Sequence, residues 1–244
     1  MSVEWLTPDW PVPPGVRALA TWRGGGVSGG PFASLNLGDH VGDDPHAVAS
    51  NRRMLVAAAG VPVEPAWLRQ VHGTRVADLD AGVPDGPADA AVARCRGRVA
   101  AILTADCLPV LLAAEDGEAV AAAHAGWRGL AAGVLEATVR ALGVPPARLV
   151  AWIGPGIGRK HYEVGPEVRA AFASQGSAVE QAFQVNARGR YLADLPLLAR
   201  RRLEALGIER VGATADCTFS DTNRYFSHRR DGHCGRQATL IWID

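Results

Sequence analysis

Leu103-Thr-Ala-Asp-Cys-Leu-Pro-Val110 and Ala123-His-Ala-Gly-Trp-Arg-Gly-Leu130 are two apolar runs that give way to Gly, Pro or a charged residue. This pattern is typical of a buried strand that enters a turn. Each run places one reactive side chain at that point, and a third stretch of the same form has His72 directly before a glycine. Because a rigid sheet holds its strand ends in place, we predict that His72, Cys107 and His124 meet in space.

The remaining strands and helices are predicted from the spacing of apolar residues and from the turn and capping residues that bound each run. Four short apolar runs separated by polar or Gly-containing turns predict a sheet buried on both faces: Ala90–Ala93, Val99–Thr104, Leu108–Ala113 and Ala119–Ala123. Further strands are predicted at Trp67–Val71, Arg75–Leu79, Leu149–Ile153, Val211–Ala213 and Ala238–Ile243. Capping residues and helical spacing predict helices from Asp44-Pro45 to Gly60, over Gly129–Leu142 and Pro166–Ala173, and from Asp194 to Gly207.

Composition limits the class of protein. The chain has 244 residues, a formal net charge of +0, 48% hydrophobic and 20% charged residues, which predicts a globular core. No linker-like change in composition divides it, so we expect one domain over residues 1–244. Zero net charge argues against nucleic acid as the main partner. We expect no membrane span and no signal peptide, and four sparse cysteines favour a reduced, cytoplasmic chain.

The His72, Cys107 and His124 side chains suit zinc, which accepts imidazole and thiolate ligands and keeps a fourth position open in catalytic sites. The spacing of the three residues matches no short zinc-finger motif. On the residues alone, the favoured alternative is a hydrogen-bonded core histidine at 124 and a small buried hydrophobe at 107. A structural zinc site with a closed fourth ligand is a further alternative.

Charged residues close to these ligands suggest roles in binding and proton transfer. Asp106 is expected to support the metal ligands and, with His228, is a candidate general acid. Arg128 suits a phosphate or carboxylate near the metal. Arg229 and Arg230 are candidate anion binders, with a solvated surface loop as the alternative. A second metal site from Cys217, His228, His233 and Cys234 is the less favoured interpretation of those residues.

Seven ordered motifs resemble the bacterial YfiH family, also called the laccase-domain or polyphenol oxidase family and, more recently, purine nucleoside phosphorylase or peptidoglycan editing factor. They are Gly25-Gly-Val-Ser28, Ser34-Leu-Asn-Leu-Gly38, Gln70-Val-His-Gly73, Leu103-Thr-Ala-Asp-Cys-Leu-Pro109, His124-Ala-Gly-Trp-Arg-Gly129, Gly154-Pro-Gly-Ile-Gly158 with Tyr162-Glu-Val-Gly165, and Phe226-Ser-His-Arg-Arg-Asp-Gly232. The resemblance implies a layered α/β/β/α sandwich with mixed sheets, and a catalytic zinc on His72, Cys107 and His124. It also implies phosphorolysis of adenosine, inosine, guanosine and methylthioadenosine, with adenosine deaminase activity.

Two other activities compete with this expectation. Cys107 could act as a nucleophile with His124 as its base, on an amide such as a cell-wall peptide. A copper polyphenol oxidase is disfavoured, because the chain has seven histidines and no His-x-His pair, whereas a multicopper oxidase needs many more imidazoles. Copper remains an adventitious occupant of the zinc site, since it binds N and S ligands tightly. The sequence does not decide whether the chain forms oligomers.

Overall fold

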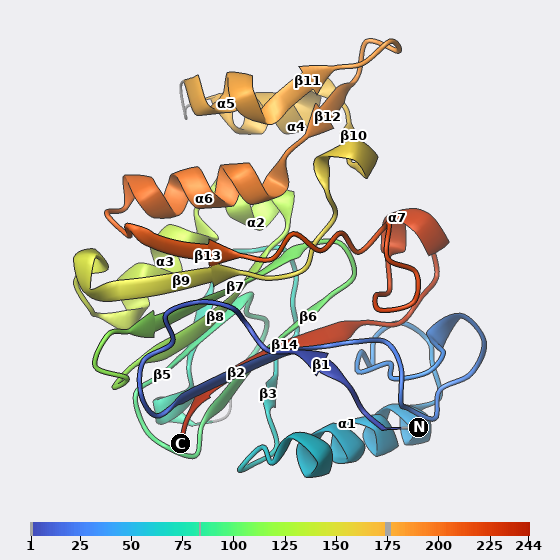
Figure 1. Cartoon of the computed structure of the whole chain (residues 1–244), viewed down its shortest axis with the longest axis vertical. Coiled ribbons are helices and arrows are strands. Elements are labelled where there is room, and N and C mark those ends of the chain that lie inside the picture. The colour runs from blue at the N-terminus through green and yellow to red at the C-terminus, as the bar shows by residue number, and fades with distance from the viewer. Residues whose placement is uncertain (1, 83, 174–176) are drawn as a thin grey trace.

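Two large β-sheets packed face to face between helical layers form the protein in a computed structural model that describes residues 2–82, 84–173 and 177–244 (Figure 1). One sheet has five strands in the order β1-β2-β14-β6-β3. These strands are β1 (Trp5–Leu6), β2 (Val16–Thr21), β14 (Gln237–Ile243), β6 (Val99–Thr104) and β3 (Ala66–Trp67). All neighbours are antiparallel except β3 and β6, so the sheet is mixed.

The second sheet has six strands in the order β13-β9-β7-β8-β5-β4. They are β13 (Arg210–Ala213), β9 (Leu149–Ile153), β7 (Leu108–Ala114), β8 (Val120–Ala125), β5 (Ala90–Ala93) and β4 (Val76–Asp78). The two outer pairs, β13 with β9 and β4 with β5, are parallel, and the inner pairs are antiparallel. Both large sheets are therefore mixed, as the resemblance implies.

Helices cover the outer faces of the two sheets (Figure 1). The helix α1 (Pro45–Ala59) packs on the five-stranded sheet, where Leu55 contacts the same apolar cluster as Leu103 and Leu240. On the other side, α2 (Trp127–Ala132), α3 (Val134–Leu142) and α6 (Leu195–Ala205) cover the six-stranded sheet. A third apolar cluster fills the space between the sheets. The predicted α/β/β/α sandwich is confirmed.

The four apolar runs are fully buried strands, but they do not form one sheet as the sequence analysis expected. Val99–Thr104 is β6 of the five-stranded sheet, whereas the other three runs are neighbouring strands of the six-stranded sheet. Burial on both faces gives strands in two stacked sheets the same apolar pattern. Periodicity therefore identifies the strands without assigning them to a sheet.

The predicted helix over Gly129–Leu142 is two helices, α2 and α3, and this expectation was wrong. Gly133 separates them with a φ of 99°, in the left-handed region that favours glycine. The helix from Pro45 is confirmed, with Asp44 accepting a hydrogen bond from the His46 amide and Gly60 ending it at a φ of 61°. Asp194 likewise caps α6.

A small three-stranded sheet, β10-β12-β11, was not predicted. Its strands are β10 (Glu163–Val164), β12 (Tyr191–Ala193) and β11 (Phe183–Val185), and α4 (Pro166–Ala171) and α5 (Ser177–Ala182) accompany them at one end of the molecule (Figure 1). The helix α7 (His228–Asp231) and four 3₁₀ turns complete the elements: Gly30–Phe32, Leu79–Ala81, Pro146–Arg148 and Arg159–His161. Strands of two or three residues are too short to show a period. No helix among the described residues is long and apolar enough to cross a membrane.

Gly133 gives a test of the helix break. Gly133→Ala should lower the free energy of unfolding by about 1–2 kcal/mol, because a Cβ is strained in the left-handed region. Gly133→Asn is the matched control and should lose less, since asparagine tolerates this conformation. Urea denaturation measures both. Equal unfolding midpoints for wild type and Gly133→Ala would contradict the assigned break.

Candidate metal centre

The side chains of His72, Cys107 and His124 meet where β6 and β8 end and β7 begins. Their ligand atoms all lie within 4.8 Å of one another. His124 belongs to β8, Cys107 lies in the turn between β6 and β7, and His72 lies in the segment between β3 and β4. The Cys107 Sγ is 3.7 Å from His72 Nε2, and the two imidazole ring centroids are 4.7 Å apart. The structure therefore brings together the three residues that the sequence analysis grouped.

Unusual backbone conformations hold two of these turns. His72 has a φ of 61° and Asp106, next to Cys107, has a φ of 98°. Non-glycine residues rarely occupy this region and do so mainly at functional sites, where the surrounding structure compensates for the strain. Gly126 allows the close approach, because a Cβ there would lie 2.7 Å from His72 Cδ2 and 2.8 Å from Cys107 Sγ. Any larger residue at 126 would displace both ligands.

Asp89 organises both histidines. Its carboxylate is fully buried and accepts hydrogen bonds from the amides of Val71, His72 and Gly73 at 3.1, 2.8 and 2.7 Å. His124 Nδ1 lies 2.9 Å from Asp89 Oδ1. Because an ionised carboxylate only accepts, this contact fixes the proton on Nδ1 and leaves Nε2 of His124 for a metal. Asp89 was not among the predicted site residues; the signal for it in the sequence is an acidic residue directly before the fully apolar strand β5.

Gln70 joins the His72 segment to the strand that leads to Cys107. Its side-chain Nε2 donates to the Leu103 carbonyl at 2.8 Å, and its Oε1 accepts from the Leu103 amide at 2.8 Å. The side-chain amide thus takes the place of a strand partner beyond the end of β3, where β6 continues to Thr104. This pair fixes the position of the His72 turn relative to the turn that carries Cys107.

The three ligands are strongly coupled electrostatically. Burial by itself would raise the pKa of Cys107, but the two imidazoles lower it to about 6. Burial would lower the pKa of His124, but the Cys107 thiolate and Asp89 raise it to about 9. Burial opposes ionisation of Asp89, yet its hydrogen bonds with His124 and the backbone amides keep its pKa below the usual value. In the metal-free protein the centre is therefore a thiolate beside an imidazolium.

Asp106 lies beside Cys107 and connects distant segments. Its two carboxylate oxygens accept from the Thr218 hydroxyl at 2.7 Å and from the Arg229 amide at 2.6 Å. Its carbonyl accepts from the Ile157 amide at 2.9 Å. These contacts place the start of α7 next to the Cys107 turn.

The three predicted anion-binding arginines have different surroundings. The Arg128 guanidinium lies 4.4 Å from the Trp127 ring centroid, and that of Arg229 lies 5.2 Å from the Tyr162 ring centroid and donates to the Glu163 carbonyl. The Arg230 guanidinium instead donates to the carbonyls of Thr218, Phe219 and Tyr225 and pairs with Asp231, so it braces its own loop.

Tyr162 is a further residue of this region that the sequence analysis did not select as a site residue. Burial raises its pKa above the usual range. The charges of Cys107 and Asp106 act in the same direction, whereas those of Arg229 and Arg128 act in the opposite direction. Tyr162 thus interacts electrostatically with the predicted ligand and with two of the predicted anion binders. Its only sequence signal was its place in one of the ordered motifs.

The second group of potential ligands is not assembled. Among the described residues, His72, Cys107 and His124 form the one group of three or more such side chains able to hold an ion. The Cys217 thiol accepts from the Gly158 amide. His228 Nδ1 lies 2.5 Å from the Gly232 carbonyl, and His233 Nε2 lies 2.6 Å from that of Val41.

The His72, Cys107 and His124 group fits a metal ion on chemical grounds. It offers one thiolate and two imidazoles, its ligand atoms lie within 4.8 Å of one another, and Asp89 sets the tautomer of one imidazole. Three protein ligands leave a coordination position for water or substrate. His72 is exposed, Cys107 is half-buried and His124 is buried, so solvent reaches the group from the side of His72.

Known proteins resemble the chain over nearly its full length. A family model described as multi-copper polyphenol oxidoreductase laccase matches residues 17–244. A purine nucleoside phosphorylase of Pseudomonas aeruginosa is 52% identical over 98% of both chains, and the Escherichia coli purine nucleoside phosphorylase YfiH is 47% identical over 98% of both. A crystal structure of a Neisseria meningitidis protein superposes with a TM-score of 0.94 at 46% identity, covering 98% of this chain and 99% of that one.

The role of Asp89 can be tested through metal affinity. Asp89→Asn should weaken Zn²⁺ binding about 10- to 100-fold, because the amide cannot accept from all four donors. Competition with a chromophoric chelator measures the dissociation constant. Asp116→Asn, a surface change, is the control and should bind like wild type. An unchanged dissociation constant in Asp89→Asn would remove the assigned role.

The electrostatics of Cys107 predict a pH profile in the metal-free protein. A thiol reacts as the thiolate, so alkylation at Cys107 should rise to a plateau through a midpoint near pH 6, where an ordinary cysteine has its midpoint near 9. At pH 7 about 90% of Cys107 should be ionised. Iodoacetamide labelling followed by peptide mass spectrometry measures the rate, with exposed Cys95 as the internal reference. A midpoint for Cys107 near pH 9 would contradict this coupling.

Proposed function

The chain belongs to the laccase-domain family that includes YfiH, and on this premise we propose that it is a zinc-dependent purine nucleoside phosphorylase. The family assignment drawn from the seven motifs is thereby confirmed. Relatives of 44–52% identity across the chain are named purine nucleoside phosphorylase, which supports an enzyme of this kind. The observation that carries the proposal is the His72, Cys107 and His124 group with Arg128 and Arg229 nearby.

The metal in this proposal is zinc, held by His72, Cys107 and His124. Imidazole and thiolate are ligands that zinc accepts, and copper is the adventitious competitor. When bound, zinc supplies a Lewis acid that orients an anionic group and offsets negative charge. A multicopper oxidase would need further histidine clusters, and the described residues contain no second such group. We therefore do not propose the copper oxidase reaction that the laccase description of the family names.

Phosphorolysis requires phosphate and nucleoside to be held in line, so that phosphate attacks the ribose C1′ while the C1′–N bond to the purine breaks. Arg128 and Arg229 provide the positive charges that suit phosphate. Trp127 and Tyr162 keep these guanidinium groups in place by stacking. Asp106, which accepts from the Arg229 amide, is a positioning residue in this proposal, and the proton for the leaving purine comes from His228 or water.

The substrates extend to adenosine, inosine, guanosine and methylthioadenosine, with adenosine deaminase activity at the same site. This range comes from the resemblance of the motifs. Deamination differs in that water replaces phosphate and attacks C6 of the purine ring, the bond from C6 to the amino group breaks, and ammonia leaves. We propose that the same metal-binding residues serve this reaction. The proposed setting is a single domain over residues 1–244 in the cytoplasm, with nucleosides and phosphate as substrates and no nucleic-acid partner.

One observation favours a second candidate function. The lowered pKa of Cys107 and the adjacent His124 resemble a cysteine nucleophile with its base. Such a hydrolase would cleave an amide of a peptidoglycan precursor and would need no metal. The same side chains cannot serve as zinc ligands and as a free nucleophile–base pair at once, so the metal requirement separates the two functions.

Metal removal and one cysteine exchange test the proposal. Cys107→Ser should lose zinc and lose phosphate-dependent release of adenine from adenosine by about 100-fold or more. Cys95→Ser is the matched control, because Cys95 is an exposed cysteine outside the site. Chelation of wild type should abolish adenine release, and added Zn²⁺ should restore it. Zinc content by mass spectrometry and adenine by chromatography provide the measurements.

The opposite outcome also has a clear meaning. A wild-type protein that retains full adenine release after complete removal of zinc would exclude the zinc-dependent reaction. Cleavage of a peptidoglycan peptide by the metal-free protein, blocked by alkylation of Cys107, would replace it with the cysteine hydrolase.

A further inference from the structure

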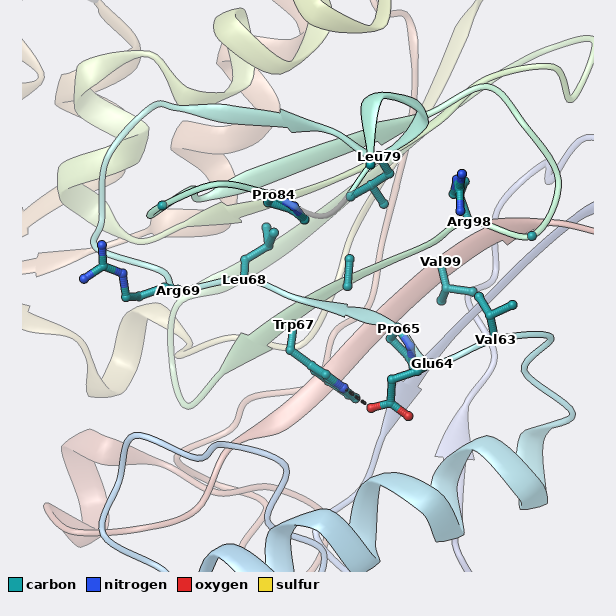
Figure 2. A pocket seen from close by; sticks show the side chains of 14 residues that line it. Val63, Glu64, Pro65, Trp67, Leu68, Arg69, Leu79, Pro84, Arg98 and Val99 are labelled. Carbon is teal, nitrogen blue, oxygen red and sulfur yellow. Dashed lines mark hydrogen bonds between the residues drawn. The ribbon is translucent and has the colours of Figure 1, made fainter.

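A cavity of about 680 Å³ lies away from the metal centre, along the outer edge of β3. Its walls come from the segment 63–69 around β3, from four residues that follow β4, and from the start of β6 (Figure 2). The four residues are Leu79, Gly82, Pro84 and Gly86. The volume is within the range of cavities that hold small organic ligands, about 300–1,000 Å³. None of the predicted metal or substrate residues lines it.

The centre of this cavity is apolar. Leu68, Leu79 and Pro84 lie between its two ends, with Trp67 and Pro65 on another side (Figure 2). Leu68 and Leu79 are buried, and Trp67 is partly exposed. Such a surface favours the apolar body of a ligand over water.

The ends of the cavity carry positive charge. Arg69 and Arg98 lie at opposite ends (Figure 2), and both are exposed. Within the described part of the chain, neither side chain has a hydrogen-bond or ion-pair partner. Glu64 is the one acidic residue among the described lining residues, and it accepts a hydrogen bond from Trp67 Nε1. The cavity thus joins an apolar centre to two free guanidinium groups, and the charge that complements it is negative.

We propose that this cavity binds an amphipathic organic anion, with an apolar ring system over Leu68 and Leu79 and a carboxylate, sulfonate or phosphate group at Arg69 or Arg98. The two arginines select the anion, and the apolar centre selects against small inorganic ions. The proposal concerns binding at the β3 edge and does not depend on the proposed phosphorylase activity.

The cavity wall continues directly into the metal centre. The Arg69 carbonyl accepts a hydrogen bond from the Ala88 amide at 3.1 Å. The next residue on the first segment is Gln70, which is hydrogen-bonded to Leu103. The next residue on the second segment is Asp89, which is hydrogen-bonded to His72 and His124. A ligand that orders these segments opposes the local opening that would release His72. We therefore expect an anion in the cavity to slow the loss of metal from the centre.

The binding test uses 8-anilinonaphthalene-1-sulfonate, an aromatic anion whose fluorescence rises in apolar sites. Wild type should show saturable binding. The Arg69→Ser/Arg98→Ser double variant should bind at least about 10-fold more weakly, because it loses the charged hydrogen bonds between the guanidinium groups and the sulfonate. Arg53→Ser/Arg140→Ser removes the same charge from exposed positions outside the cavity and should bind like wild type. Thermal unfolding of each variant establishes that it is folded.

A neutral analogue separates anion recognition from apolar binding. N-Phenyl-1-naphthylamine should bind the wild type and the Arg69→Ser/Arg98→Ser variant equally. Equal sulfonate affinity in the two double variants, or no saturable binding to wild type, would overturn the proposed site. A wild-type protein that binds the sulfonate but releases no adenine from adenosine would contradict the proposed phosphorylase function and leave the proposed anion site standing.

The rate of zinc dissociation tests the link between the cavity and the metal centre. Zinc dissociation into excess chelator should be slower in wild type saturated with the sulfonate, and unchanged by it in Arg69→Ser/Arg98→Ser. A probe that binds wild type without altering the zinc dissociation rate would disprove the link between the cavity and the metal centre.

Discussion

The buried carboxylate of Asp89 is the interaction on which the metal centre depends. It sits at the start of β5 and accepts from three consecutive amides and from His124. A fully buried carboxylate is stable only when its charge is compensated, and here the compensating groups are parts of the site itself. The same contacts therefore compensate the negative charge of Asp89, hold His72 in a left-handed turn and fix the tautomer of His124.

The two stacked sheets make that arrangement possible. β6 belongs to the five-stranded sheet and β7 to the six-stranded sheet, so the turn that carries Cys107 runs from one layer to the other. His124 comes from β8, which pairs with β7 with Pro109 opposite His124. Gln70 then ties the third ligand segment to Leu103 of β6. His124 thus lies on a strand, and hydrogen bonds and short turns hold His72 and Cys107 against the strands.

Charge distribution separates the metal centre from the cavity at the β3 edge. The centre combines a thiolate with imidazoles and keeps arginines close by, which suits a metal and an anionic substrate. The cavity has no titratable nucleophile among its described lining residues and offers arginines around an apolar surface. The metal centre therefore has groups that can react or bind a metal, whereas the cavity at the β3 edge has groups suited to binding alone. The short segments 68–73 and 86–89 connect the two.

The sequence by itself determined the long buried strands, the capped helices and the three metal-ligand candidates, because burial pattern, capping residues and strand ends are local properties. It could not assign β6 to the correct sheet, since doubly buried strands look alike. It did not reveal the roles of Asp89 or Gln70. The partners of Asp89 lie 16–18 and 35 residues away, and the partner of Gln70 lies 33 residues away. Only the tertiary structure decided these contacts, because hydrogen bonds between distant segments depend on how the sheets stack and leave no periodic trace in the chain.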